Sequence, residues 1–362
     1  MKELAPRTLR LFFKDNPNLT PGRVLQFRDI FRDCAGGFVR NSRNLAWRDC
    51  AFHHLYGLGI VHQFSENLSY DRITFAPRSG SGRTCAGWAD LLHFSGCKGK
   101  IHVADCEMSG TNDDPINVHG THLRIVERLD DHRIRVCFMH PQSYGFQAFF
   151  PGDQIEFVNH ASLHSYASNA VLAVTMEDDK NILLTLESPI PAFQQGDVVE
   201  NVTWTPEVEV RNCTVSVDSC RGFLLTTRKP ILIENNTFIK TTMPAILIAD
   251  DANSWFESGP VRDVTIRGNR FVQCHEPVIE IAPENLTEKP EEPVHRNVRI
   301  LDNVFDLIGE HAVSAKSVKG LTIAGNRFSR DRVTVDLRSC TDVTIENNGP
   351  TNVVAESPGS AS

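Results

Sequence analysis

Apolar and polar residues alternate along the chain in eight-residue segments that align with one another. Alternation with a period of two is typical of β-strands. The first and third positions of a segment are usually apolar, the sixth is often cysteine or asparagine, and the eighth is always apolar and most often phenylalanine. The segments begin at Leu45, Leu68, Ile101, Val208, Ile231, Val264, Val298 and Leu321, with a shortened ninth at Val343.

The spacing of these segments predicts the fold. Successive starts lie 23, 33, 107, 23, 33, 34, 23 and 22 residues apart. A β-rich repeat of about 22–24 residues indicates a solenoid in which each coil stacks on the last, and longer intervals indicate loops at the corners. Leucine-rich repeats are not favoured, because no Leu-x-x-Leu-x-Leu pattern recurs. We therefore expect an all-β chain folded as a right-handed parallel β-helix.

The 107-residue interval interrupts the repeat. It contains alternating segments at 133–138, 153–158, 170–175 and 181–186, with turns at Gly152-Asp153 and Gly196-Asp197. Short strands joined by such turns predict a small β-barrel inserted at 121–204, so that 1–120 and 205–362 form the β-helix. The insert should overhang the segment just before it.

That preceding segment carries the strongest candidate chemistry. Asp113 and Asp114 stand side by side between a Gly-Thr-Asn turn and a short apolar strand, and Asp90 opens a similar strand one repeat earlier. Neighbouring carboxylates raise one another's pKa, and such groups occur where acid–base chemistry is done. An isolated Asp-Asp pair is more often an acidic turn.

Repeat register changes this interpretation. Strands in neighbouring coils lie about 4.7–4.9 Å apart. Aligning Asp90 with Asp114 brings three carboxylates together, and extending the alignment to Gly59 stacks His62, His93 and Asn117 as a polar ladder. A slip of one residue would send these side chains to the opposite face.

Two carboxyl groups that flank a bond are the requirement of glycoside hydrolysis. Asp90, Asp113 and Asp114 are therefore the catalytic candidates. Because Asp90 and Asp113 belong to different coils, we expect the wider separation that accompanies inversion. One acid must keep its proton, and crowding of carboxylates supplies a reason for a raised pKa.

Polar and aromatic residues elsewhere suit a sugar ring and its hydroxyls. For each of them alone a structural role is at least as common. The substrate-binding candidates are Arg83 and Trp88 in the loop before Asp90, His93, Asn117 and His119 beside the acidic segment, His140 and Tyr144 in the insert, Arg228 on the next coil, and Trp255 in a corner loop.

Composition excludes other classes of protein. The chain is 41% hydrophobic and 23% charged, with a formal net charge of −8, which argues against nucleic acid or an anionic membrane as partner. No apolar run reaches the roughly 18 residues of a membrane span, and no signal peptide is evident at the N-terminus. Ten cysteines without metal-like spacing indicate reduced thiols, which favours a reducing compartment.

Several motifs together resemble glycoside hydrolase family 110, over nearly the whole chain. They are Gly57-Leu58-Gly59-Ile60-Val61, Gly80-Ser81-Gly82-Arg83-Thr84, Asp90 with His93-Phe94-Ser95-Gly96-Cys97, the run from Asp113 to Leu123, Tyr144-Gly145-Phe146 and Asp251-Ala252-Asn253-Ser254-Trp255.

The resemblance implies an exo-acting α-galactosidase that removes terminal α-1,3-linked galactose with inversion, on a β-helix with a barrel insert. Blood group B antigens and linear α-1,3-galactosides would be its substrates, without a metal or organic cofactor. It places the catalytic residues at Asp90, Asp113 and Asp114, without assigning acid and base.

Two departures from the family pattern stand out. Relatives extend further upstream, so a coil edge would be exposed here, and an exposed edge invites pairing with another chain. A homodimer is therefore left open. An acidic residue is also expected in the insert loop where this chain has Gln147, a further substrate-site candidate. If that acid donates the proton in relatives, activity here would be reduced, because such a group contributes about 10²–10⁴-fold.

Two other functions remain compatible with the sequence. One is a β-helix that binds α-galactosides without turnover. The other is a different β-helix enzyme, either a polygalacturonase-like hydrolase, which needs a cluster of arginine or lysine, or a lyase in which the three aspartates hold Ca²⁺.

Overall fold

The computed structural model describes residues 1–27, 32, 34–349 and 352–354. The chain divides into two compact units, Met1–Phe31 and Arg32–Ser362. In the first unit, β1 (Lys2–Ala5) and β2 (Thr8–Arg10) pair as an antiparallel hairpin. This pairing differs from the parallel coils that the sequence predicted from residue 1 onward.

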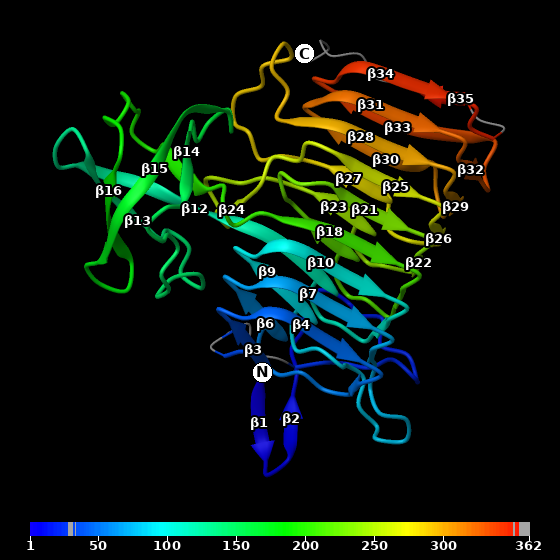
Figure 1. The fold of residues 1–362 in the computed structure, drawn as a ribbon. Helices are drawn as coiled ribbons and strands as arrows, with labels where there is room; N and C mark the ends of the chain where they lie inside the picture. The colour runs from blue at the N-terminus through cyan, green and yellow to red at the C-terminus, as the bar shows by residue number, and fades with distance from the viewer. Residues whose placement is uncertain (28–31, 33, 350–351, 355–362) are drawn as a thin grey trace. The chain divides into compact units, whose positions relative to one another are not determined.

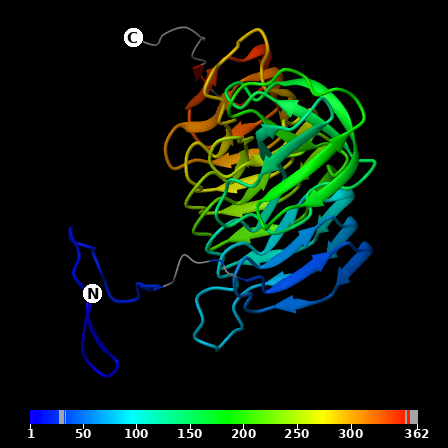
Figure 2. The same ribbon diagram turned by 90° about the vertical axis from the view of Figure 1, so that its left-hand side faces the viewer.

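The second unit is a parallel β-helix, and the described residues contain no helix. Its coils stack in sequence order, from blue to red in Figures 1 and 2. No helix of the described residues is long and apolar enough to cross a membrane. Three sheets run along the stack. A complete coil contributes one strand to each of the three sheets.

The first sheet contains the strands predicted from the repeat. In order these are β4 (Arg43–Arg48), β7 (Glu66–Asp71), β10 (Lys98–Ala104), β18 (Pro206–Arg211), β21 (Ile231–Glu234), β25 (Val264–Arg267), β28 (His295–Leu301), β31 (Val318–Ala324) and β34 (Thr341–Glu346). Leu45 pairs with Leu68, Leu68 with Ile101, and so on to Leu321 with Val343. The predicted register of this sheet is confirmed.

The second sheet carries the column of apolar eighth positions. Its strands are β5 (Ala51–Phe52), β8 (Thr74–Phe75), β11 (Glu107–Ser109), β19 (Thr214–Ser216), β22 (Thr237–Ile239), β26 (Arg270–Val272), β29 (Val304–Asp306) and β32 (Arg327–Phe328). Phe271 stacks on Phe238 and Phe305 with ring centroids 5.2 and 4.8 Å apart, inside the core.

Stacked asparagines line the turn between these two sheets. Asn269 Nδ2 donates to Asn303 Oδ1 at 3.0 Å, and Asn236 Nδ2 donates to Asn269 Oδ1 at the same distance. Each amide also donates to a backbone carbonyl, as Asn269 does to Ile233 at 2.9 Å. The ladder satisfies buried backbone groups that would otherwise lack partners, which explains the recurrence of asparagine.

The third sheet positions the acidic segment. Its solenoid strands are β3 (Gly37–Arg40), β6 (Ile60–Gln63), β9 (Leu92–Ser95), β12 (Ile116–Arg128), β20 (Phe223–Leu225), β23 (Ile246–Ile248), β27 (Ile279–Ile281), β30 (His311–Lys316), β33 (Arg332–Arg338) and β35 (Asn352–Val354). Strand β12 pairs in parallel with β9 and β20 at its start and then leaves the solenoid.

The second half of β12 enters an antiparallel barrel (green in Figure 1), whose core includes Leu123, Ile134 and Phe157. The barrel adds β13 (Arg133–Cys137), β14 (Gln154–Val158), β15 (Ser165–Met176), β16 (Asn181–Leu186) and β17 (Val198–Asn201). An inserted barrel is present, as the sequence predicted. A short strand, β24 (Glu257–Ser258), pairs with β12 at Gly120 and Thr121.

One predicted register is wrong by a single residue. Val61 pairs with His93, whereas the prediction paired His62 with it. Gly59 adopts φ +70°, and a Cβ there would lie 2.2 Å from the Asp90 carbonyl oxygen, so only glycine fits this close approach of the two coils. The residues after Gly59 each pair with a residue one position further along the next coil than predicted.

His62 therefore points into the core. Its Nδ1 lies 3.0 Å from the carbonyl oxygen of His93 and its Nε2 lies 2.5 Å from the Tyr70 hydroxyl. Burial lowers the pKa of His62 to about 3, so the ring is neutral and its two nitrogens are satisfied.

Candidate functional site

Strand pairing brings the three predicted catalytic aspartates to one end of the third sheet. Ile116 pairs with Leu92, which places Asp114 level with Asp90 on the neighbouring coil, and Leu91 N donates to the Asp114 carbonyl at 3.2 Å. All three side chains are buried, with exposed fractions of 2% for Asp90, 6% for Asp113 and 1% for Asp114.

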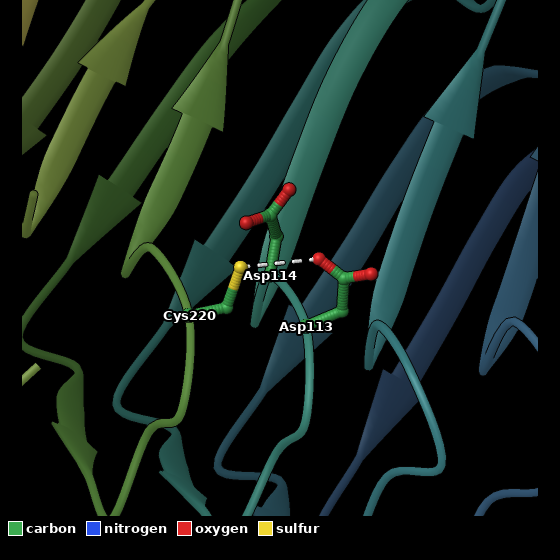
Figure 3. Close-up of side chains that lie close together, drawn as sticks. All are labelled: Asp113, Asp114 and Cys220. Carbon is green, nitrogen blue, oxygen red and sulfur yellow. Dashed lines mark hydrogen bonds between the residues drawn. The ribbon is translucent and has the colours of Figure 1, made fainter. Parts of the chain in front are cut away.

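A compact turn holds the acidic pair in place. Thr111 Oγ1 donates to the Ala89 carbonyl at 2.9 Å and accepts from the Asp113 backbone amide at 3.3 Å. Figure 3 shows the side chains of Asp113, Asp114 and Cys220 close together, and the thiol of Cys220 donates to Asp113 Oδ1 at 3.3 Å.

Two arginines neutralise most of the acidic charge. Arg32 pairs with Asp113. Arg221 lies between the acidic pair, with Nε 2.7 Å from Asp114 Oδ1 and Nη2 3.4 Å from Asp113 Oδ1. Three carboxylates and two guanidiniums leave one negative charge uncompensated, so the buried cluster favours retention of one proton.

The burial of this charge shifts two carboxyl pKa values upward. Desolvation, followed by the charge of Asp113, raises the pKa of Asp90 well above its ordinary value. Desolvation also raises the pKa of Asp114, although the guanidinium of Arg221 opposes the shift.

A pair of histidines continues from Asp90. His93 Nδ1 lies 2.8 Å from Asp90 Oδ2, and the Nε2 atoms of His93 and His119 lie 3.1 Å apart. His119 Nδ1 lies 2.5 Å from the Gly120 carbonyl oxygen. Burial lowers the pKa of both rings, so the neutral imidazole is favoured at each position.

These groups open into a pocket of about 890 Å³, continuous with solvent. Strands β6, β9 and β12 form its floor, and segments of the barrel and of the corner loop before β24 form its walls. The predicted residues that line it are Asp90, His93, Asp113, Asp114, Asn117, His119, His140, Tyr144 and Trp255.

The walls from the barrel and the corner loop meet in an aromatic contact. The rings of His140 and Trp255 stack with centroids 4.3 Å apart, and the Arg32 guanidinium lies 5.7 Å from the Trp255 ring centroid. Trp255 keeps 43% of its surface exposed, which leaves its ring accessible from the pocket.

Four other predicted binding residues lie away from the pocket lining. Arg83 is in an exposed loop, and Trp88 packs on Tyr56 with ring centroids 5.5 Å apart. Arg228 pairs with Glu200 at the junction of solenoid and barrel. The geometry gives no support to a sugar-binding role for these three residues.

Gln147 is the fourth. Its Nε2 donates to the Phe149 carbonyl at 3.0 Å, which directs the amide into its own loop. An ionised acid could not make this bond, because a carboxylate has no hydrogen to donate to the Phe149 carbonyl. The effect of Gln147 on activity stays a prediction.

Sequence reasoning missed three charged residues that line the pocket, Arg32, Arg221 and Glu257. Arg221 could have been found from the repeat register. Ile116 pairs with Phe223, so Arg221 occupies the position one coil beyond Asp114. Glu257 follows directly on the loop in which Trp255 was noted. Arg32 lies outside the aligned repeat, and no pattern pointed to it.

Among the described residues, one group of side chains has ligand atoms close enough for a metal ion, namely Asp113, Asp114 and Cys220, within 4.8 Å of one another. Its donors fit a cation poorly. Both carboxylates already face guanidiniums, and burial raises the pKa of the Cys220 thiol, whereas metals bind the thiolate. We therefore derive no chemistry from a metal at this site.

Comparison with known proteins agrees with this arrangement. Residues 133–199 match the family model of the GLAA-B beta-barrel domain II. The chain is 46% identical to the alpha-1,3-galactosidase A of Akkermansia muciniphila, over 95% of this chain and 58% of that protein. The chain is similar over nearly its whole length to proteins named alpha-1,3-galactosidase. The resemblance seen in the sequence is confirmed.

Other alpha-1,3-galactosidases match over a similar range. In Bacteroides thetaiotaomicron, enzyme A is 43% identical over 96% of this chain and 63% of its own length, and enzyme B is 38% identical over 91% and 56%. This chain thus spans little more than half the length of these relatives. Among solved structures, the tailspike protein gp49 of Pseudomonas phage LKA1 matches with a TM-score of 0.22 and 12% identity, over 75% of this chain and 67% of that one.

Proposed function

We propose that this chain is a glycoside hydrolase that removes terminal α-1,3-linked galactose from blood group B-type or linear α-1,3-galactosides, with inversion. The observation that carries the proposal is the convergence of three buried aspartates and two arginines at the floor of one pocket. The names of the homologues support galactose and the α-1,3 linkage as the substrate.

The aspartate cluster can supply both groups that hydrolysis needs, a carboxylic acid for the leaving oxygen and a carboxylate that activates water. Asp113 faces two guanidiniums, from Arg32 and Arg221, which compensate the charge of a carboxylate that acts as the base. Asp90 has no such ion pair among the described residues and lies on the neighbouring coil. A base and an acid on separate coils leave room for a water, as inversion requires.

The remaining lining residues suit a single sugar ring. Trp255 and Tyr144 offer aromatic faces, and Asn117 and Glu257 offer oxygens that accept from hydroxyls. Segment 140–146 of the barrel forms part of the pocket wall, and a walled pocket suits a terminal sugar residue better than the middle of a long polymer. This geometry supports exo action.

The pocket is less suited to a uronate substrate. Recognition of a uronate needs cationic groups that are free to pair with its carboxylate. Arg32 and Arg221, the arginines that line the described pocket, each already pair with an aspartate. The contacts thus favour a neutral sugar.

Incubation with galactosyl-α-1,3-galactose, followed by proton NMR, tests the proposal. We expect galactose to appear first as the β-anomer, and Asp113→Asn to lower kcat by at least about 10²-fold. The matched control is Asp263→Asn, a carboxylate paired with Arg299 outside the pocket, which should leave turnover unchanged. Absence of galactose release by the folded chain would contradict the hydrolase assignment. First appearance of the α-anomer would contradict inversion alone.

A further inference from the structure

The corner loop before β24 is folded around one buried carboxylate. Asp251 is 3% exposed, and four successive backbone amides donate to its side chain. The amides of Asn253 and Ser254 lie 2.7 and 3.0 Å from Oδ1, the amide of Phe256 lies 3.0 Å from Oδ2, and the Trp255 amide also donates to Oδ2. Successive amides that converge in this way form a concavity suited to an anion, and here the chain's own carboxylate fills it.

The backbone of this loop is held in a costly conformation. Phe256 adopts φ +60°, in the left-handed region, which a bulky residue occupies only where its surroundings enforce it. Its amide is bound by Asp251, and its ring is buried in an apolar cluster with Val158 of the barrel. These two anchors fix the direction of the chain directly after Trp255.

The ends of the loop are closed and braced independently of that carboxylate. Asp251 N donates to the Glu257 carbonyl at 2.9 Å, which joins the two ends of the loop. Asn253 Nδ2 donates to the His160 carbonyl at 2.9 Å, in the barrel segment after β14. The Asp251 carboxylate is therefore left to organise the residues between these fixed points.

The loop brings one aromatic side chain to the candidate active site. Trp255 lines the pocket and keeps its ring exposed there, whereas Asp251 is not among the lining residues. Glu257 also lines the pocket, but it belongs to β24 and is held by pairing with Thr121 of β12. Of these two wall residues, Trp255 is thus the one whose position depends on Asp251.

We infer that Asp251 is a positioning residue, whose carboxylate fixes the corner loop so that the Trp255 ring faces a sugar in the pocket. The inference rests on the proposed hydrolase function and adds to it a residue that does not contact the substrate. A wall that is ordered in advance lowers the entropy cost of binding, because the substrate need not order it. Loss of Asp251 should therefore weaken binding more than it slows the bond-breaking step.

Asp251→Ala tests the inference by removing the acceptor of all four amides. Ser254 and Trp255 are exposed, so water can replace the lost acceptor and we expect the chain to fold. KM for galactosyl-α-1,3-galactose should rise by about tenfold, with kcat changed by less than about threefold. Asp251→Asn keeps the size of the side chain but replaces one accepting oxygen by a donor, so it should raise KM in the same direction and serves if Asp251→Ala does not fold.

A double-mutant cycle with Trp255→Ala distinguishes positioning from a general structural role. If Asp251 acts through Trp255, Asp251→Ala should raise KM by no more than about twofold once the ring is absent. Effects of the two substitutions that multiply in full would show that Asp251 acts elsewhere, and would overturn the inference.

Hydrogen exchange, followed by mass spectrometry, reads the loop without any assay of activity. Amides bound to the Asp251 carboxylate should exchange slowly in the intact chain. In Asp251→Ala the amides of 253–256 should exchange faster by about tenfold or more, while peptides from the solenoid strands stay unchanged. Equal exchange of 253–256 in the two chains would also overturn the inference.

Asp130 provides the matched control, because its Oδ1 accepts from the amides of His132 and Arg133 at 2.9 and 2.8 Å, outside the pocket lining. Asp130→Ala should speed exchange in its own turn and leave KM unchanged. Failure of the unmodified chain to release galactose would instead refute the hydrolase proposal. The exchange measurement would then still report on the loop, and the same cycle would be measured on the Kd for the disaccharide.

Discussion

Arg221 Nε lies 2.7 Å from Asp114 Oδ1, on the coil next to the acidic pair. The guanidinium also lies 3.4 Å from Asp113 Oδ1, so one side chain compensates two buried carboxylates. Removal of one partner from a buried ion pair leaves the other charge without compensation, which costs about 3–5 kcal/mol. Arg221 therefore links the stability of the second unit to the charge state of the candidate site.

Arg221→Gln tests this link. Loss of the positive charge raises the pKa of Asp114 further and leaves the buried acidic pair with one guanidinium fewer. We expect the acidic limb of the pH–rate profile to move up and the thermal midpoint to fall. Arg133→Gln is the matched control, because Arg133 pairs with Asp130 at the surface and its loss should cost about 1 kcal/mol or less. An unshifted acidic limb would show that Arg221 does not act on the base.

Trp255 provides a prediction for substrate binding. Its ring stacks on His140 and is exposed to the pocket, so Trp255→Ala removes a contact surface without opening a cavity in the core. We expect KM for the disaccharide to rise by about tenfold, because aromatic contacts contribute about 0.5–1.5 kcal/mol beyond burial. Trp255→Phe should recover most of the loss. Equal KM values for all three chains would remove Trp255 from the binding site.

Asp218 predicts a dependence of stability on pH. Burial raises its pKa to about 8, so the folded chain holds this proton while an unfolded aspartate releases it near pH 4. The folded state then binds more protons between about pH 4 and 8, and its stability falls as the pH rises through that range. The loss should amount to roughly a few kcal/mol.

Replacement by a neutral isostere tests that prediction. Asp218→Asn should flatten the fall in thermal midpoint between pH 5 and pH 8 that the unmodified chain shows. The exposed Asp342→Asn serves as control and should leave the fall intact. A midpoint in Asp218→Asn that still drops as steeply would assign the pH dependence to other groups.

The asparagine ladder should contribute strongly to the free energy of unfolding. Asn269→Ala removes the acceptor of the Asn236 backbone amide, at 2.9 Å, and the donor to the Ile233 carbonyl. Each buried polar group left without a partner costs about 1–3 kcal/mol, so chemical denaturation should show a loss of about 2–5 kcal/mol. Arg270→Ala changes the exposed neighbouring residue and should cost less than about 0.5 kcal/mol. A similar loss in both variants would refute the role of the ladder.

The sequence alone determined the repeat, the register of the first two sheets and the level of Asp90 with Asp114. Inward positions of stacked coils must be apolar and the turn must satisfy buried amides, so these constraints recur in the sequence at every coil. The first turn of each repeat could therefore be predicted from the local sequence pattern.

Only the tertiary structure decided which polar residues meet in the pocket. The alternation of apolar and polar residues cannot distinguish a histidine that points outward from one that is buried with hydrogen-bond partners. His62 is buried, because Tyr70 and the His93 carbonyl satisfy its ring nitrogens. Arg32 and Glu257 reach the pocket from segments outside the aligned repeat. Such contacts depend on where loops return in space, and a local pattern does not contain that information.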